Sequence, residues 1–193
     1  MHTIAPLEDR RVSARPDDEG FTLIELLVVL LIIGILLAIA IPTFLSTTKS
    51  ANNTAAQADL KTALTGADTY FMTAGAQSYS YIDSSSGGTS TISAVGTGLT
   101  YVSGTGASSS GPKVISLSVS NNGSVIVMTA LSHGSMDCWG ILDIKATLTA
   151  AVDHETAIGT YYFVVPGSSA TSCSAQSVAP TVANISTTAF PHG

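Results

Sequence analysis

The stretch Gly20-Phe21-Thr22-Leu23-Ile24-Glu25-Leu26-Leu27-Val28-Val29 opens a long apolar run and decides what kind of chain this is. No polar side chain occurs from Leu26 to Ile41, and Glu25 is the one charge between Phe21 and Leu45. As a helix, these ~25 residues rise ~1.5 Å each and extend about 38 Å, enough to cross a bilayer. A carboxylate beside hydrocarbon costs free energy and usually has a partner. The run therefore predicts a membrane-spanning helix with a functional acid near its start.

The helix is expected to continue beyond the apolar run, to about residue 74. Gly34 and Pro42 are its weak points, because Gly lowers helix propensity and Pro removes one backbone hydrogen bond. We expect both to loosen the helix when it leaves the lipid. Beyond Pro42 the pattern becomes amphipathic, which predicts an apolar stripe against a globular head. This stripe consists of Leu45, Ala56, Leu60, Ala63, Leu64, Ala67 and Phe71.

The second half of the chain reads as an antiparallel sheet of about four strands. Residues 115–120 alternate between apolar side chains and Ser, which predicts a half-buried strand. Asn121-Asn122-Gly123-Ser124 is a tight-turn signal for a hairpin. Further strands are expected at 125–131, 139–146 and 157–165, with a short one near 99–102. The predicted fold class is therefore α+β, with a long N-terminal helix packed on an antiparallel sheet.

The charge balance excludes some classes of function. The 193-residue chain carries a net charge of −6, and after residue 20 it has four lysines, no arginine and eight acidic residues. This argues against nucleic acid as a partner, because affinity for phosphates comes largely from Lys and Arg. The sequence shows no nucleophile elbow, phosphate loop or carboxylate pair. We therefore expect that the protein is not an enzyme and binds no cofactor. The alternative is a membrane-anchored enzyme, which would need a pocket with several ionisable groups.

The opening residues resemble the processing and assembly motif of type IV pilins and pseudopilins. The resemblance implies that a prepilin peptidase cuts between Gly20 and Phe21 and N-methylates Phe21. It also implies that Glu25 pairs with the new amino terminus of a neighbouring subunit. Thr22, at the start of the helix, is of a residue type that caps helices. The leader ends in Asp17-Asp18-Glu19, where many members of the family carry Lys or Arg. Arginines further back in the leader favour a cytoplasmic location for it.

The resemblance also implies partners, a location and a domain plan. The partners are other pilin subunits, the peptidase and methyltransferase, the assembly platform with its ATPase motor, and membrane lipid before assembly. The protein is expected in the cytoplasmic membrane as a single-pass subunit and then in an extracellular filament. The expected parts are a leader (1–20), a transmembrane half-helix (21–45) and a head (46–193). The head divides into helix 46–74, variable loop 75–112, sheet 113–165 and tail 166–193.

Cys138 and Cys173 are the two cysteines of the chain. An exported protein meets oxidising surroundings, which favours a disulfide over two buried thiols, and such a pair is usual in pilins. The bond would close a loop of about 36 residues and stabilise the fold by roughly 3–4 kcal/mol.

Other functions remain open from the sequence. A secretory signal is one, since Ala38-Ile39-Ala40 mimics a cleavage site, but the long run and the preceding Gly-Phe boundary argue against it. The family also includes secretion and competence pseudopilins. A minor pilin or adhesin would bind a surface through loop 75–112.

Several weaker signals are discounted. His133, Asp137 and Cys138 do not have metal-site spacing, so we predict no metal. His154 beside Glu155 reads as turn surface. Three Asn-x-Ser/Thr triplets, which arise readily in such a Ser/Thr-rich chain, start at Asn52, Asn122 and Asn184.

Overall fold

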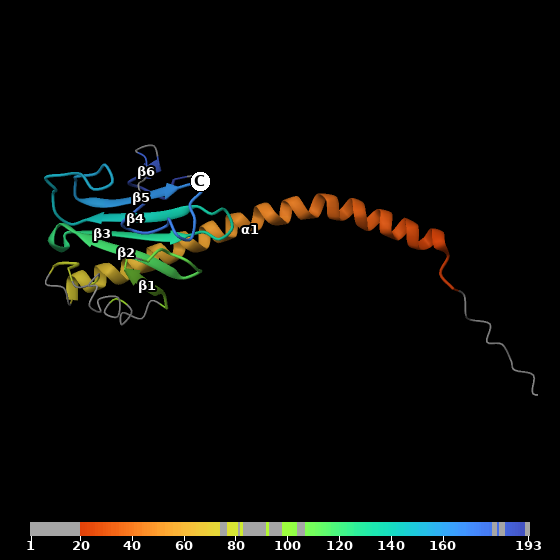
Figure 1. The fold of residues 1–193 in the computed structure, drawn as a ribbon, viewed down its shortest axis with the longest axis horizontal. Helices are drawn as coiled ribbons and strands as arrows, with labels where there is room; N and C mark the ends of the chain where they lie inside the picture. Colours follow the sequence, from red (N-terminus) through yellow and green to blue (C-terminus); the bar gives the residue numbers. More distant parts are fainter. Residues whose placement is uncertain are drawn as a thin grey trace, which may run out of the picture. The chain divides into compact units, whose positions relative to one another are not determined.

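The computed structural model describes residues 20–73, 77–80, 82, 92, 98–103, 107–178, 181 and 184–191. The chain divides into two compact units with a boundary between Thr43 and Phe44. The α-helix α1 (Leu23–Thr73) contributes to both units (Figure 1). Its bounds lie within two residues of those predicted.

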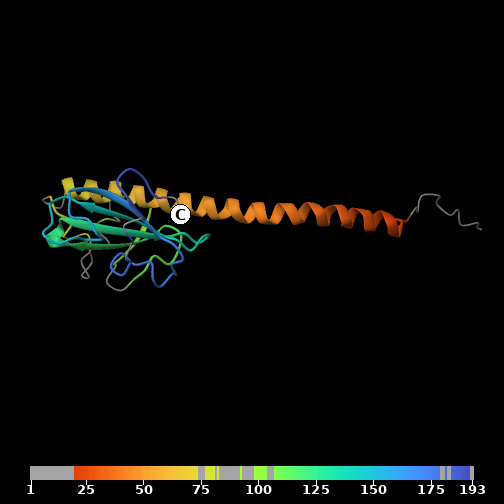
Figure 2. The same ribbon diagram turned by 90° about the horizontal axis from the view of Figure 1, so that it is seen from above.

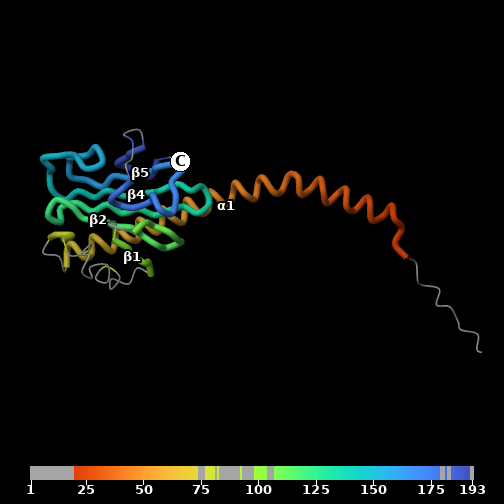
Figure 3. Tube along the Cα trace, in the orientation of Figure 1, coloured from red at the N-terminus to blue at the C-terminus, as the bar shows by residue number. Residues whose placement is uncertain are grey.

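The second unit contains a six-stranded sheet in the order β1-β2-β3-β4-β5-β6. Its strands are β1 (Thr100–Ser103), β2 (Val114–Ser120), β3 (Val125–Leu131), β4 (Cys138–Ile144), β5 (Gly159–Val165) and β6 (Ile185–Ser186). The strands from β2 to β6 run antiparallel, and Figure 3 shows the successive passes of the chain through them.

Two features of the sheet differ from the sequence prediction. The prediction gave about four strands in an antiparallel sheet, whereas β1 pairs with β2 in parallel, with Tyr101 opposite Ile115. The tail also adds a sixth strand, β6, along the outer edge of β5. Both edge strands are short and follow long connections, so their pairing depends on distant contacts that local periodicity does not report.

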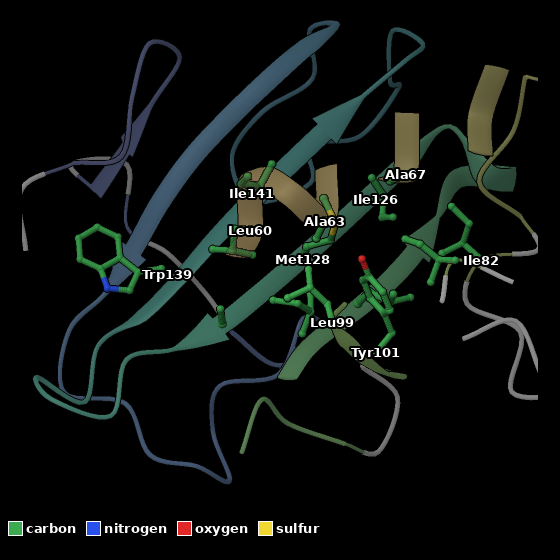
Figure 4. Packing of buried hydrophobic residues seen from close by; sticks show 14 of the residues in the cluster. Leu60, Ala63, Ala67, Ile82, Leu99, Tyr101, Ile126, Met128, Trp139 and Ile141 are labelled. Carbon is green, nitrogen blue, oxygen red and sulfur yellow. The ribbon is translucent and has the colours of Figure 1, made fainter. Parts of the chain in front are cut away.

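The head half of α1 packs on one face of the sheet, as Figure 2 shows. This helix-side core, seen in Figure 4, includes Leu60, Ala63, Ala67, Ile126, Met128, Trp139 and Ile141. The predicted helix stripe is correct at Ala56, Leu60, Ala63 and Ala67. It is wrong at Leu45, which is 55% exposed. Tyr70 is buried in place of Phe71, which packs at the edge of this core.

The opposite face of the sheet is covered by the tail, and β3 and β4 are therefore buried along their whole length. This tail-side core consists of Val125, Val127, Leu131, Cys138, Leu142, Ile144, Tyr161, Phe163, Cys173, Ala175 and Val178. The predicted disulfide is present: Cys138 at the start of β4 is bonded to Cys173, with their Cα atoms 5.4 Å apart. The bond fixes the covering segment to the centre of the sheet.

The tail corrects the prediction that β2 is half-buried. The alternation predicts a solvent face for Ser116, but this side chain is fully buried. Its hydroxyl donates to the carbonyl of Ala107 at 2.8 Å and accepts from the amide of Ala175 at 3.1 Å. The amide of Ser109 donates to the carbonyl of Cys173 at 2.8 Å. The Ser116 hydroxyl thus pairs with backbone carbonyl and amide groups of the segments that cover the sheet. Burying these groups without a hydrogen bond would cost free energy.

The hairpin between β2 and β3 follows its sequence signal. Asn121, Asn122 and Gly123 all have positive φ angles, of 51°, 56° and 83°. Asn and Gly tolerate this left-handed region better than other residues. The turn also holds the segment after α1, because the amide of Tyr79 donates to the carbonyl of Gly123 at 2.8 Å.

Gly140 in β4 lies opposite Phe163 in β5. A Cβ atom at Gly140 would overlap the Phe163 ring, so the ring occupies the space that a side chain would need. We expect Gly140→Ala to lower the free energy of unfolding by about 1–3 kcal/mol, measured by urea unfolding. Gly111→Ala is the matched control, since a Cβ there would lie 3.5 Å from Val114 Cγ2, an ordinary contact. Equal unfolding midpoints for the two variants would contradict this account.

A polar cluster links α1 to the end of β4. The Lys145 ammonium lies 2.8 Å from Asp68 Oδ1 and 3.0 Å from Asp143 Oδ2. The Tyr79 hydroxyl donates to the same two carboxylates, at 3.1 and 2.7 Å. Thr160 donates to Asp143 Oδ1 at 2.7 Å, so the buried Asp143 carboxylate is satisfied on both oxygens.

This cluster predicts loss of stability in alkali. Burial raises the pKa of the Tyr79 phenol far above its ordinary range, and Asp143 and Asp68 raise it further. Burial alone lowers the pKa of Lys145, but its hydrogen bonds and charge interactions with both acids raise it overall. Both groups are therefore protonated in the folded state at a pH where the unfolded chain loses their protons.

The resulting stabilisation is fully present below the unfolded pKa values, near ~10, and is lost as the pH rises further. We expect the urea midpoint to fall between about pH 9.5 and 11, and to fall less steeply in Tyr79→Phe. A flat profile, or the same slope in the variant, would be inconsistent with this role of the cluster.

Candidate assembly site

The described part of the first unit is an apolar helix whose side chains are exposed. From Phe21 to Thr43 every residue is exposed, and the large apolar side chains are between 45% and 85% accessible. By length and composition α1 is able to cross a bilayer. Contiguous apolar surface of this size marks contact with lipid or with other protein.

The amino-terminal end of α1 is closed by a reciprocal capping box between Thr22 and Glu25. Thr22 is the residue before the first helical turn, and its hydroxyl accepts from the Glu25 amide at 3.3 Å. The Glu25 carboxylate reaches back and accepts from the Thr22 amide at 2.9 Å and the Thr22 hydroxyl at 2.7 Å. The predicted cap by Thr22 is thus present. The sequence reading missed the return bond, although the Thr-x-x-Glu spacing is its signature.

The capping box uses one oxygen of Glu25. Both bonds from Thr22 end on Oε2, and Oε1 accepts no hydrogen bond from any residue that the structure describes. A carboxylate has about four acceptor positions, so Glu25 keeps capacity for a further cationic donor. The carboxylate also borders a groove on the helix surface lined by Phe21, Ile24, Val28 and Val29. A charged acceptor at the edge of an apolar surface is suited to fixing how another apolar helix is placed.

Gly20 and Phe21 lie just before the helix in exposed, non-helical chain. Phe21 is 85% exposed, and a Cβ atom at Gly20 would meet nothing within 4 Å. The fold of this chain therefore does not itself require glycine at position 20. Gly34 and Pro42 both lie inside α1, and their predicted part in loosening the helix remains a prediction.

Two comparisons with known proteins found a similarity. Residues 15–41 match the family model of the prokaryotic N-terminal methylation motif. A similar curated protein is the type IV major pilin protein PilA of Myxococcus xanthus (strain DK1622). It is 45% identical over 62 residues, which are 32% of this chain and 28% of that protein. Over the matched residues, the chain resembles type IV pilins. The matched region spans less than a third of the Myxococcus xanthus pilin, and no solved structure matches.

The matched motif is named for methylation at the amino terminus, and it includes Gly20, Phe21 and Glu25. The structure also places the residues of the weaker sequence signals. Cys138 is in the disulfide, and the buried Asp137 carboxylate accepts from the Gly167 amide at 3.4 Å. Among the described residues no group of three or more His, Cys, Asp and Glu side chains is placed to hold a metal. His154, in a two-residue turn, has a positive φ of 71°.

Loop 75–112, the candidate adhesive surface, lies partly outside the described residues. The described parts include Tyr79, Ile82, Ile92 and Tyr101, all buried in the helix-side core. The segment is thus anchored in the head at several points.

Proposed function

We propose that this protein is the precursor of a structural subunit of a type IV pilus filament. A prepilin peptidase removes residues 1–20, Phe21 becomes the N-methylated amino terminus, and the subunits polymerise through α1. The observation that carries the proposal is the Glu25 carboxylate, with one oxygen still able to accept a donor, on an exposed apolar helix. The matched relative is named a major pilin, which favours a pilus subunit over a pseudopilin or an adhesin.

Lipid and filament offer the apolar side chains of α1 similar surroundings. Moving leucine and isoleucine side chains from lipid to a bundle of like helices changes apolar burial little. A carboxylate and an ammonium in the same apolar surroundings gain strongly from meeting each other. The pair of Glu25 with the terminal amine of a neighbouring Phe21 therefore sets register and helps to drive extraction from the membrane.

The remaining partners follow from this cycle. A single-pass subunit waits in the cytoplasmic membrane with the leader inside and the head outside. A platform and an ATPase motor then move it into the extracellular filament. Gly34 and Pro42 are the places where α1 loses hydrogen bonding most readily during that transfer.

Mass spectrometry of sheared surface filaments tests processing directly. We expect a mature chain that begins with N-methylated Phe21 and retains the rest of the sequence. Gly20→Ala should block cleavage, although the chain has room for the methyl group, because the peptidase must approach the backbone closely. A mature chain that starts at another residue, or an unmethylated amino terminus, would contradict the proposal.

A further inference from the structure

The loop between β3 and β4, residues 132–137, packs on α1 near the start of the head unit. A Cβ atom at Gly134 would lie 2.9 Å from the Cα atom of Lys49 and 2.8 Å from the Asn52 amide nitrogen. The Ser135 hydroxyl donates to Asn53 Oδ1 at 2.6 Å. This loop is therefore held at a fixed place on the helix, beside Lys49.

The loop is a defined turn that presents one apolar side chain to solvent. The amide of Ser132 donates to the carbonyl of Asp137, and the amide of Met136 donates to the carbonyl of Ser132, both at 2.9 Å. Met136 has a φ of 61° and is 40% exposed. A bulky residue in the left-handed region is unusual and is a reason to look for a function.

The same end of the head exposes the last apolar residues of α1. Phe44 and Leu45 are exposed, and Lys49 lies one helical turn beyond Leu45, a rise of about 6 Å. Residues four apart share a helix face, so Leu45 lies on the same face of α1 as Lys49. The loop contacts the helix at Lys49, and Leu45 is therefore one turn away from it. We define the basal surface as Phe44, Leu45, Lys49, His133 and Met136. All five are exposed, and none is acidic.

The neighbouring acids do not cancel the charge of this surface. The Asp137 carboxylate in the same loop is buried and bonded to Gly167. Asp59 lies ten residues beyond Lys49 on α1, a rise of about 15 Å. It lines one pocket with His133, but Lys113 lines the same pocket and offsets its charge there. The basal surface is thus apolar with a basic side chain, in a unit that is otherwise poor in cations.

We propose that the basal surface rests on the headgroups of anionic lipids while the subunit is unassembled. The inference depends on the proposed insertion of α1 in the membrane. If Leu45 marks the end of the membrane segment, the chain keeps Lys49 and the attached loop within about one helical turn of the lipid surface. Met136 then enters the interface, and the Lys49 ammonium, on a stem that spans apolar surroundings, meets lipid phosphate. The surface orients the head for its transfer to the filament.

The test uses the full chain in vesicles of phosphatidylglycerol and phosphatidylcholine whose acyl chains are brominated near the headgroup. Met136→Trp places a fluorescent side chain in the basal surface, and the signal of the native Trp139 is measured in the parent protein and subtracted. Ile158→Trp is the matched control. Ile158 is 62% exposed and precedes β5, whose first residue pairs with Ile144 at the other end of β4. Leu36→Trp, near the middle of the apolar run, reports insertion of α1 separately, in parallel vesicles whose acyl chains are brominated near the middle of the bilayer.

We expect Met136→Trp to be quenched about threefold more than Ile158→Trp, because only an interfacial side chain reaches the bromine atoms. Lys49→Ser, and vesicles of phosphatidylcholine alone, should each weaken the headgroup contact by about fivefold. Equal quenching at positions 136 and 158, with strong quenching at position 36, would overturn the basal surface and leave membrane insertion intact. Absence of quenching at position 36 would overturn both.

The parent sequence with Met136→Asn gives a second measurement. Asn tolerates the left-handed backbone, so the turn is retained while the apolar side chain is removed. Hydrogen exchange at the amides of residues 132–137 should become at least about twofold faster in this variant when it is in vesicles, and be unchanged in detergent. The same rate in vesicles for parent and variant would count against lipid as the partner of Met136.

Discussion

Filaments should be lost in Glu25→Gln, while cleavage after Gly20 and methylation of Phe21 continue. The variant removes the charge that would pair with the terminal amine of a neighbour, and leaves that amine unpaired in an apolar bundle. Because the cost of an uncompensated buried charge is large, we expect assembly to fall by about a hundredfold or more. The measurement is filament yield per cell by immunoblot and electron microscopy, with the processed monomer quantified in the membrane.

Because of the capping box, the substitution Glu25→Gln tests the charge of residue 25 separately from its role as a helix cap. Gln at the third helical position still reaches back to the residue before the helix, so Glu25→Gln keeps the cap and removes only the charge. Thr22→Val has the opposite effect, since it removes the hydroxyl that bonds Glu25 and keeps the carboxylate. Thr22→Ser, which retains the hydroxyl, is its control. Filaments at parent yield in Glu25→Gln, or equal losses in Glu25→Gln and Thr22→Val, would show that the charge is not what assembly requires.

The double variant Cys138→Ala/Cys173→Ala should be the least stable of the head variants. The bond closes a loop between residues 35 apart and holds the tail over the sheet. Chain entropy predicts a loss of roughly 3–4 kcal/mol in the free energy of unfolding. For a unit of this size that corresponds to a fall of about 10 °C in Tm, measured by circular dichroism on the full chain in detergent.

Reduction of the parent protein provides the control for this variant. Both sulfur atoms belong to residues with no exposed surface, so mild reductant should leave the folded protein unchanged. Unfolding in reductant should then reproduce the Tm of the double variant. If the double variant melted within about 2 °C of the parent, the tail would be held by its hydrogen bonds and the entropic account would fail.

Both predictions concern residues that the sequence singled out, but through different kinds of signal. Glu25 is conspicuous because it is a lone acid in an apolar run, so its environment can be read from its immediate neighbours. The pairing of the cysteines is predicted by the oxidising location and the family resemblance. Nothing local to Cys138 shows that Cys173 lies against the centre of the sheet.

By itself the sequence determined the elements whose physics is local. The apolar run and its continuation specify α1, residues 125–131 specify β3, and the Asn-Asn-Gly turn joins β3 to β2. The Thr22–Glu25 cap belongs in this group as well. In each case the decisive interactions join residues only a few positions apart, so periodicity and turn chemistry are sufficient.

The tertiary structure alone decided what depends on contacts between distant segments. It buried Ser116 under the tail, paired β1 in parallel with β2, and brought Asp68, Lys145 and Asp143 together. It also attached the loop carrying Met136 to the helix beside Lys49. These outcomes depend on which surfaces the tail and the loops cover, and that is set by the packing of the whole head.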